Sequence, residues 1–109
     1  MINLPRHTKR FSSVKDELNR AGVAFEHAPA VDGQCLSDGV LYAMVTVLGR
    51  IFMTPGMIGC FLSHRVCWET CVRRNVPLLV FEDDASLVDD FAATLSSALT
   101  ELQLSLIHI

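Results

Sequence analysis

The sequence has no hydrophobic run long enough to cross a membrane. No apolar stretch among its 109 residues reaches the roughly 18 residues that a transmembrane helix needs. The first residues, Met1 to Pro5, also lack the apolar segment of a secretory signal peptide. We therefore expect a cytoplasmic protein without a transmembrane segment.

The sequence also lacks an excess of basic residues. Its formal net charge is −3, and basic side chains gather only between Arg6 and Arg10 and at Arg73 and Arg74. This distribution does not predict a nucleic-acid-binding surface. The cluster near the N-terminus is still suited to an anionic ligand such as a phosphate.

Cysteines with the CxxC spacing are missing as well. The four cysteines, at positions 35, 60, 67 and 71, are expected to be free thiols in a reducing compartment. Cys60, His64, Cys67 and Cys71 share one stripe of a predicted helix, but the first and last would lie about 16 Å apart along its axis. One zinc ion cannot bind all four, because its ligands lie within about 2.3 Å. Cys67 and Cys71 with outside ligands are an alternative, although core packing explains the cysteines better.

The sequence does contain enough apolar side chains for a core. Half of the residues are hydrophobic and 19% are charged, which excludes a disordered chain. A chain of this length can bury about two-thirds of its unfolded surface. We expect one domain over residues 1–103. The tail at 104–109 is interpreted as truncated or artefactual, because a domain does not normally end in an exposed apolar run.

The strongest chemical signal is a run of three carboxylates. Pro77 and the apolar residues Leu78–Phe81 predict a buried strand, and Glu82, Asp83 and Asp84 follow it directly. Adjacent carboxylates repel one another unless water or a cation neutralises them, and their oxygens suit Mg²⁺ or Mn²⁺. Because open α/β sheets bind ligands beyond the carboxyl ends of their strands, we predict a divalent metal with a diphosphate ligand. The alternative is a solvated turn in which Asp83 or Asp84 caps the next helix.

The rest of the pattern predicts an α/β fold with a parallel βαβ unit. The predicted elements are a strand at Ile2–Leu4, a helix at Val14–Ala21 capped by Ser12 or Ser13 and stopped by Gly22, a strand at Val23–His27, a helix from Pro55 to about Arg74, the strand at Leu78–Phe81 and a helix at Asp89–Leu102. Thr54 and Pro55 are typical of a helix start. Residues 29–53 give no clear prediction.

Four segments, taken together, resemble one protein family. They are Ile-Asn-Leu at 2–4 with Arg6 and Arg10, Val-Asp-Gly at 31–33, Thr-Pro-Gly-x-Ile-Gly-Cys-x-x-Ser-His at 54–64, and Val-Phe-Glu-Asp-Asp-Ala at 80–85. In this order and spacing the sequence resembles glycosyltransferase family 25, which includes bacterial lipooligosaccharide and collagen hydroxylysine galactosyltransferases. The resemblance covers residues 2 to about 91. It implies a GT-A-like (Rossmann-like) fold, with a mostly parallel sheet flanked by helices and with the C-terminal part missing.

The resemblance also implies site residues and a reaction. Glu82 and Asp84 occupy the outer positions of a DxD-like motif, which binds Mn²⁺ (or Mg²⁺) and through it the diphosphate of a UDP-sugar donor. The implied donor-binding residues are Asn3, Arg6, Arg10, Asp32 and Asp83. The implied reaction moves a sugar, expected to be galactose, to a glycan or lipid-linked oligosaccharide acceptor in lipooligosaccharide or surface-polysaccharide synthesis. Such an enzyme would work in the cytoplasm, in peripheral contact with the inner face of the bacterial inner membrane.

The sequence departs from the family pattern in two ways. Met57 stands where the family usually has Glu, and since this position is the third of the helix, the change removes a capping box at a cost of about 1 kcal/mol or less. The region after the acidic motif is also missing, and we expect the acceptor site and the general base there. The isolated chain is therefore expected to be inactive.

Other functions and roles compete with this interpretation. One is a non-catalytic remnant that binds nucleotide sugar or nothing, and another is a Mg²⁺-binding receiver-like signalling domain. The receiver alternative is weaker, because such domains place their acid pair after the first strand, where this chain has Pro5 and basic residues. His64 is a candidate for substrate contact, although a core histidine is the simpler interpretation. Trp68 is expected in the core.

Overall fold

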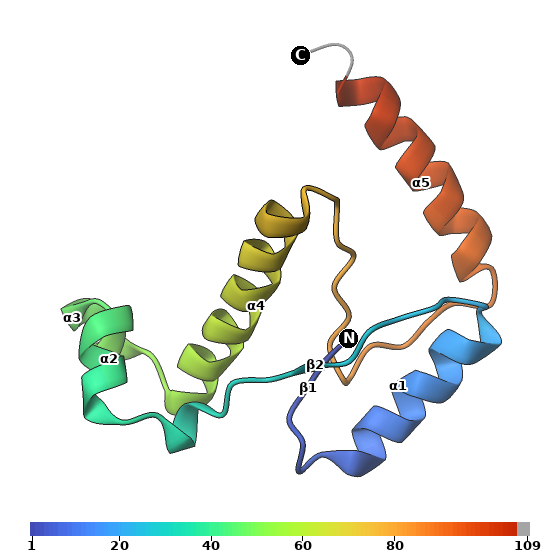
Figure 1. Cartoon of the computed structure of the whole chain (residues 1–109). Coiled ribbons are helices and arrows are strands. Elements are labelled where there is room, and N and C mark those ends of the chain that lie inside the picture. The colour runs from blue at the N-terminus through green and yellow to red at the C-terminus, as the bar shows by residue number, and fades with distance from the viewer. Residues whose placement is uncertain (107–109) are drawn as a thin grey trace.

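The computed structural model describes the backbone of residues 1–106 and the side chains of residues 1–102. Its elements are β1 (Ile2–Asn3), α1 (Thr8–Arg20), β2 (Ala28–Pro29), the 3-10 helix η1 (Gly33–Cys35), α2 (Asp38–Met44), α3 (Val47–Phe52), α4 (Pro55–Arg74) and α5 (Phe91–Leu106). β1 and β2 pair in parallel, with Ile2 opposite Ala28 and Asn3 opposite Pro29. The predicted parallel βαβ unit is confirmed, and the chain is an α/β protein in which helix predominates (Figure 1).

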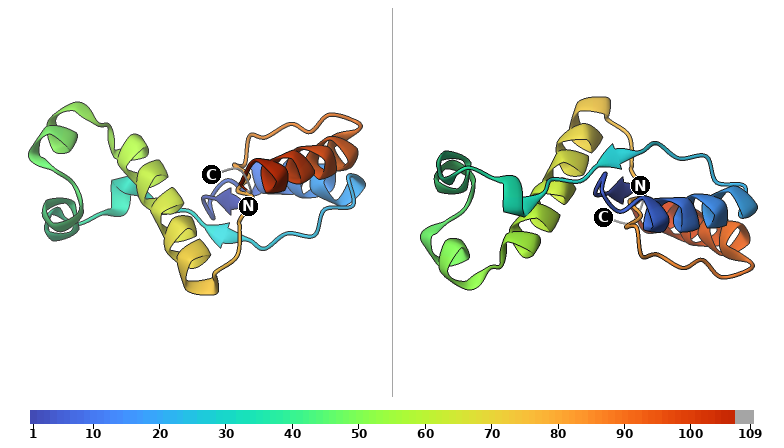
Figure 2. Two further views of the ribbon diagram at one scale, coloured as in Figure 1. Left: turned by 90° about the horizontal axis from the view of Figure 1, so that it is seen from above. Right: turned by 90° about the horizontal axis from the view of Figure 1, so that it is seen from below.

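The two strands lie between helices. Figure 2 shows α4 on one side of the strands and α1 with α5 on the other, while α2 and α3 extend beyond α4. Among the described residues, no helix combines the length and the apolar character that a membrane crossing requires.

Helix α1 begins six residues earlier than predicted. It starts at Thr8 with His7 as its N-cap, so the predicted caps, Ser12 and Ser13, are wrong. The turn after β1 fixes this start, since the His7 N–H donates to the Leu4 carbonyl at 2.8 Å and Asn3 Nδ2 donates to the His7 carbonyl at 3.2 Å. The turn after β1 thus sets the helix start in place of a side-chain cap.

The end of α1 was predicted correctly. Gly22 has φ +68°, and the N–H groups of Gly22 and Val23 donate to the carbonyls of Asn19 and Leu18. This is the Schellman arrangement, in which a left-handed residue closes the helix. Because Val23 N–H is used in this cap, the chain reaches β1 only at Ala28, and the predicted strand at residues 23–27 is wrong.

Helix α4 starts as predicted. The Thr54 side chain accepts the Met57 N–H at 3.3 Å, and Pro55 is the first residue of the helix. Asn75 ends it in the left-handed conformation, with φ 52°. The Met57 N–H keeps its cap, so the missing Glu removes only the second half of the capping box.

The segment after α4 differs from the prediction. Leu78–Phe81 is not a strand, because among the described residues a single backbone hydrogen bond, from Ile2 N–H to Phe81 O at 2.7 Å, joins it to the sheet. Helix α5 begins at Phe91 rather than Asp89 and continues to Leu106. Residues 104–106 of the predicted tail are thus helical, and residues 107–109 lie outside the described residues.

The core is small and lies between β1 and α1. Met1, Val14 and Leu18 are buried together, with aromatic and aliphatic side chains packed around them. These partly buried neighbours are Phe11, Val23, Phe25, Phe81, Ala85 and Leu87. The predicted core position of Trp68 is wrong, since the residue is 55% exposed.

The cysteines are not core residues either. Cys35 and Cys60 are exposed, and Cys67 and Cys71 are half-buried, all as free thiols. Helices α2 and α3, which were not predicted, also expose large apolar side chains. These are Val40, Tyr42, Met44, Val47, Leu48, Ile51 and Phe52.

Candidate functional site

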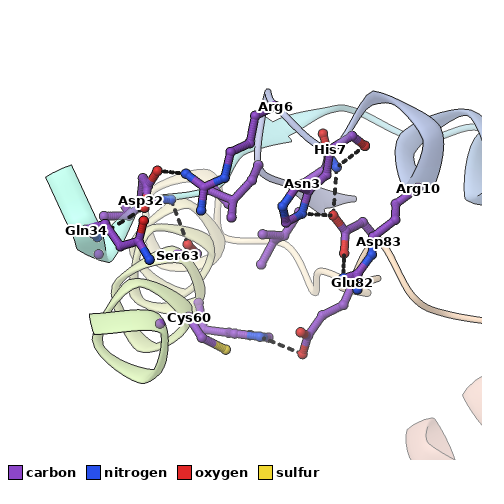
Figure 3. A pocket seen from close by; sticks show the side chains of 17 residues that line it. Asn3, Arg6, His7, Arg10, Asp32, Gln34, Cys60, Ser63, Glu82 and Asp83 are labelled. Atoms are coloured by element: carbon purple, nitrogen blue, oxygen red, sulfur yellow. Dashed lines mark hydrogen bonds and ion pairs between the residues drawn. The ribbon is translucent and has the colours of Figure 1, made fainter. Parts of the chain in front are cut away.

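A cavity of about 180 Å³ lies beyond the carboxyl ends of β1 and β2. Its lining comes from the turn after β1, from η1, from the first half of α4 and from the acidic turn (Figure 3). Six of the seven predicted site residues line it, namely Asn3, Arg6, Arg10, Asp32, Glu82 and Asp83. Asp84, the seventh, is exposed and is not among the lining residues.

Asp83 is held tightly on the side of the cavity next to α1. Its Oδ2 accepts from Asn3 Nδ2 at 2.7 Å, and its Oδ1 accepts from Arg10 Nη1 at 3.4 Å. His7 Nδ1 lies 3.6 Å from Oδ2. We call Asn3, His7, Arg10 and Asp83 the Asp83 network. Asn3 is 3% exposed, and its side-chain amide donates to both the His7 carbonyl and Asp83. The network therefore fixes the acidic turn against β1.

The other two carboxylates of the run are free to meet a ligand. Glu82 is 54% exposed, and its Oε1 lies 3.2 Å from His64 Nε2. Asp84 forms no hydrogen bond or ion pair with the part of the chain that the structure describes. The Ala85 N–H donates to the Glu82 carbonyl at 3.2 Å, so the acids form a turn. Neither Asp83 nor Asp84 caps α5, which begins seven residues after Asp84.

Two glycines, Gly33 and Gly59, allow η1, which forms one wall of the cavity, to lie directly against α4. A Cβ atom on Gly33 would overlap the Pro55 carbonyl, and one on Gly59 would lie 2.5 Å from the Val31 carbonyl oxygen. No side chain larger than hydrogen fits between these backbones. Ser63 secures the same contact, since its Oγ accepts the Val31 N–H at 2.8 Å and donates to the Gly59 carbonyl at 2.7 Å.

Asp32 follows this close contact and faces the cavity with Arg6. The Arg6 guanidinium forms an ion pair with Asp32 Oδ2, and Asp32 Oδ1 accepts the Gln34 N–H at 3.1 Å. One of the five guanidinium N–H groups is used in the pair, which leaves donors for an anionic ligand. The aspartate thus positions Arg6 across the cavity from the acidic turn.

Cys60 and His64 join Glu82 on the side of the cavity formed by α4. One ligand atom from each of the three residues lies within 4.8 Å of the others; we call them the Cys60–His64–Glu82 cluster. Burial, followed by the negative charges of Glu82 and Asp84, raises the pKa of the Cys60 thiol above its ordinary value of 9.0. The two carboxylates therefore influence the thiol electrostatically.

The site residues fit a hard divalent cation. Glu82 and Asp84 offer carboxylate oxygens, which Mn²⁺ and Mg²⁺ prefer, and both side chains are exposed. Asp83 fits less well, because its oxygens already accept hydrogen bonds from Asn3 and Arg10. Glu82 and Asp84 as the pair of metal ligands stay a prediction, and of the two only Glu82 lines the cavity.

Sequence reasoning missed several residues of the site. His7 and Gln34 line the cavity and gave no sequence signal. Cys60 was assigned to the core because free cysteines are among the most buried residues, and its partner Glu82 is remote in the sequence. Gly33 and Gly59 could have been found, since a glycine in each of two matched motifs indicates a close backbone approach.

A comparison with protein families identifies the class of protein. Residues 1–108 match the protein family described as "Glycosyltransferase family 25 (LPS biosynthesis protein)". The chain therefore belongs to glycosyltransferase family 25. This assignment confirms the resemblance found in the sequence and argues against the receiver-like alternative. No solved structure matches the chain.

Some of the curated relatives have names that describe them as inactive, and others do not. A "Glycosyltransferase 25 family member" of Anopheles gambiae is 43% identical over 93 residues, covering 77% of this chain and 16% of the relative. The corresponding protein of Aedes aegypti is 40% identical over 93 residues, with 77% and 15% covered. The mouse "Inactive glycosyltransferase 25 family member 3" is 29% identical over 111 residues, with 94% and 19% covered. The chain thus spans less than a fifth of these relatives.

Proposed function

We propose that this chain is the nucleotide-sugar-binding part of a metal-dependent glycosyltransferase with a GT-A-like fold. The donor would be a UDP-sugar, with galactose as the expected sugar, and the acceptor a hydroxyl of a glycan or of a lipid-linked oligosaccharide. One observation carries the proposal: cationic and acidic side chains from remote segments line the same cavity beyond the strand ends.

The phosphates of the donor would bind on the basic side of the cavity. Arg6 and Arg10 lie there, and Arg10 is already oriented by its 3.4 Å contact with Asp83. Guanidinium groups form strong charge-assisted hydrogen bonds with phosphate oxygens. Asp32, which is paired with Arg6, would lie on the nucleotide side of the diphosphate.

Glu82 and Asp84 would hold the divalent cation on the acidic side. When bound, Mn²⁺ (or Mg²⁺) supplies Lewis-acid stabilisation of the charge on the departing nucleoside diphosphate. Asn3 and Arg10 would keep Asp83, and with it the whole acidic turn, close to the phosphates. The general base that accepts the acceptor's proton is expected outside this chain, in the part that the longer relatives contain.

A second candidate is donor binding without turnover. It is favoured by the identity of 29% to the mouse relative named as inactive and by the share of its relatives that the chain covers. In this case the cavity binds UDP-sugar, but no product forms with any acceptor. The role in lipooligosaccharide synthesis stays a prediction that depends on the family description.

Isothermal titration calorimetry of the chain with UDP-galactose, with and without Mn²⁺, tests the proposal. We expect binding that needs Mn²⁺ and weakens at least about tenfold in Glu82→Gln and in Asp84→Asn, because each loses a charged metal ligand. Glu101→Gln, which removes an exposed charge on α5, is the matched control and should bind normally.

The outcomes separate the candidates. Mn²⁺-dependent binding followed by galactose transfer to an acceptor, measured with radiolabelled donor, supports the transferase. Binding without transfer supports the second candidate for the isolated chain. Titrations that detect no heat with UDP-galactose and Mn²⁺ would overturn both.

A further inference from the structure

Two members of the Cys60–His64–Glu82 cluster, Cys60 and His64, have no role in the reaction proposed above, and the third, Glu82, is there a ligand of the divalent cation. Cys60 and His64 are one helical turn apart, so both side chains leave α4 on the same face. Glu82 reaches them from the opposite direction, because the chain reverses after Asn75 and returns to β1, where Phe81 accepts the Ile2 N–H at 2.7 Å. Figure 1 shows this return from the end of α4 to the strands.

We propose that Cys60 Sγ, His64 Nε2 and Glu82 Oε1 form a binding site for a thiophilic divalent ion, Zn²⁺ above all. Thiolate, imidazole and carboxylate are the three ligand types that zinc uses in proteins, whereas Mg²⁺ and Mn²⁺ prefer oxygen ligands alone. The fourth position would face the cavity, as in zinc sites that keep one position for water or a substrate group.

The distances in the cluster suit a tetrahedral ion. With zinc bonds of 2.0–2.3 Å, neighbouring ligand atoms lie about 3.3–3.6 Å apart. His64 Nε2 and Glu82 Oε1 are 3.2 Å apart, and all three ligand atoms lie within 4.8 Å. Because Cys60 is exposed, rotation of its side chain closes the remaining difference of about 1 Å.

The charges of the cluster also balance. A thiolate and a carboxylate together neutralise a doubly charged ion, and the neutral imidazole completes the set. Without the ion, the thiol stays protonated beside two carboxylates; binding therefore releases the Cys60 proton to solvent. Figure 3 shows Cys60 and Glu82 facing the same side of the cavity.

A zinc ion bound at the cluster would compete with Mn²⁺ for the Glu82 carboxylate. This consequence depends on the proposed function, since Glu82 is there a ligand of Mn²⁺. Zn²⁺ at the cluster takes up the Glu82 carboxylate, so micromolar Zn²⁺ should weaken the Mn²⁺-dependent binding of UDP-galactose. The transferase site would then be regulated by the supply of a second metal.

Titration of the metal-free chain with Co²⁺, in the absence of nucleotide, tests the site directly. Co²⁺ replaces Zn²⁺ in tetrahedral sites, and a thiolate ligand gives it a charge-transfer band in the near ultraviolet. We expect this band with one equivalent of Co²⁺ and its loss when Zn²⁺ is added. Cys60→Ser should abolish the band, and Glu82→Gln should weaken Co²⁺ binding at least about tenfold.

Cys67→Ser is the matched control, because Cys67 lies on the same helix outside the cluster. The proposal fails if the parent chain shows no thiolate band, or if Cys67→Ser removes the band and Cys60→Ser does not. Glu82→Gln changes an exposed side chain, so its result does not depend on whether Cys60→Ser folds. Since the parent's titration with UDP-galactose and Mn²⁺ is a separate measurement, either proposal can fail alone.

Discussion

Two neighbouring carboxylates, Asp83 and Glu82, occupy opposite sides of one cavity and are held very differently. The Asp83 side chain is 14% exposed and contacts Asn3, His7 and Arg10. The Glu82 side chain is 54% exposed and contacts His64. One carboxylate therefore fixes the turn that carries both, and the other remains available for a ligand.

The comparison shows how a site can be rigid in its backbone and open at its side chains. The Asp83 network joins segments 80 residues apart. The Cys60–His64–Glu82 cluster lines the same cavity, and its side chains remain available to bind a ligand. Removing a member of the network should therefore reduce stability, and removing a member of the cluster should mainly change binding. The predictions below test this division, from the largest expected effect to the smallest.

Gly33→Ala should have the largest effect. The added Cβ would overlap the Pro55 carbonyl, so η1 must move away from α4, at an expected cost of about 3 kcal/mol in the free energy of unfolding. Urea denaturation measures this loss. Gly39→Ala is the control, because its Cβ would meet nothing nearer than 4.0 Å; it should be neutral or stabilising by about 0.5–1 kcal/mol. Equal effects at the two positions would contradict the close contact.

Asp83→Ala should lower the free energy of unfolding by about 1–3 kcal/mol, because it leaves the buried Asn3 amide without its partner. Glu82→Ala changes an exposed side chain and should stay within about 0.5 kcal/mol. Denaturation of the two variants in the same buffer measures the difference. Asp83→Asn should recover part of the loss, since its amide oxygen can still accept from Asn3. Equal losses for Asp83→Ala and Glu82→Ala would remove the distinction between the two sides.

Cys60 should react slowly with iodoacetamide in metal-free buffer. Its raised pKa lowers the fraction of reactive thiolate at pH 8. In a chain whose other cysteines are changed to serine, Glu82→Gln should accelerate the alkylation by up to about fivefold, the effect of one charge at about 4 Å in water. Mass spectrometry follows the modification. An unchanged rate in this variant would show that Glu82 does not act on the thiol.

The ion pair between Glu26 and Arg74 should give the smallest effect. Arg74 hydrogen-bonds Glu26 at 3.0 Å through two nitrogens, which lowers the Glu26 pKa below its ordinary value of 4.5. A carboxylate whose pKa is lower in the folded state stabilises the fold at any pH above its pKa in the unfolded state. This contribution is lost as the pH falls through the pKa of the folded state. Glu26→Gln should therefore lower the urea midpoint slightly at pH 7, and the difference should shrink below pH 4.5. A difference that grows on acidification would have the wrong sign.

Features that depend on neighbouring residues in the chain could be predicted from the sequence. Thr54 and Pro55 place the start of α4, and Gly22 places the end of α1, because each acts within a few residues. The acidic run was also predicted to lie at a ligand site, and Glu82 and Asp83 line the cavity. These signals need no knowledge of the remaining fold.

Features that depend on remote contacts could not be predicted. The Asn3 amide that bonds the His7 carbonyl at the start of α1 is itself bonded to Asp83, 80 residues away. The segment 78–81 has one backbone bond to β1, where a strand would need a ladder. Trp68 was expected in a core because of the large area that a tryptophan buries, and Cys60 because free cysteines are usually buried. In the described part of the chain α4 buries Ile58, Gly59, Leu62 and Ser63, whereas Trp68 and Cys60 lie outside this buried stripe and are exposed.

The contact between Gly33 and Gly59 has a consequence for how relatives of this protein can vary. Two main chains touch there with no side chain between them, so the distance between η1 and the start of α4 is fixed by backbone contact. Exchanges at the lining positions can alter which ligand the recess prefers, while its width stays constant. A homologue that lacks either glycine must have shifted that loop, and should accept a ligand of different dimensions.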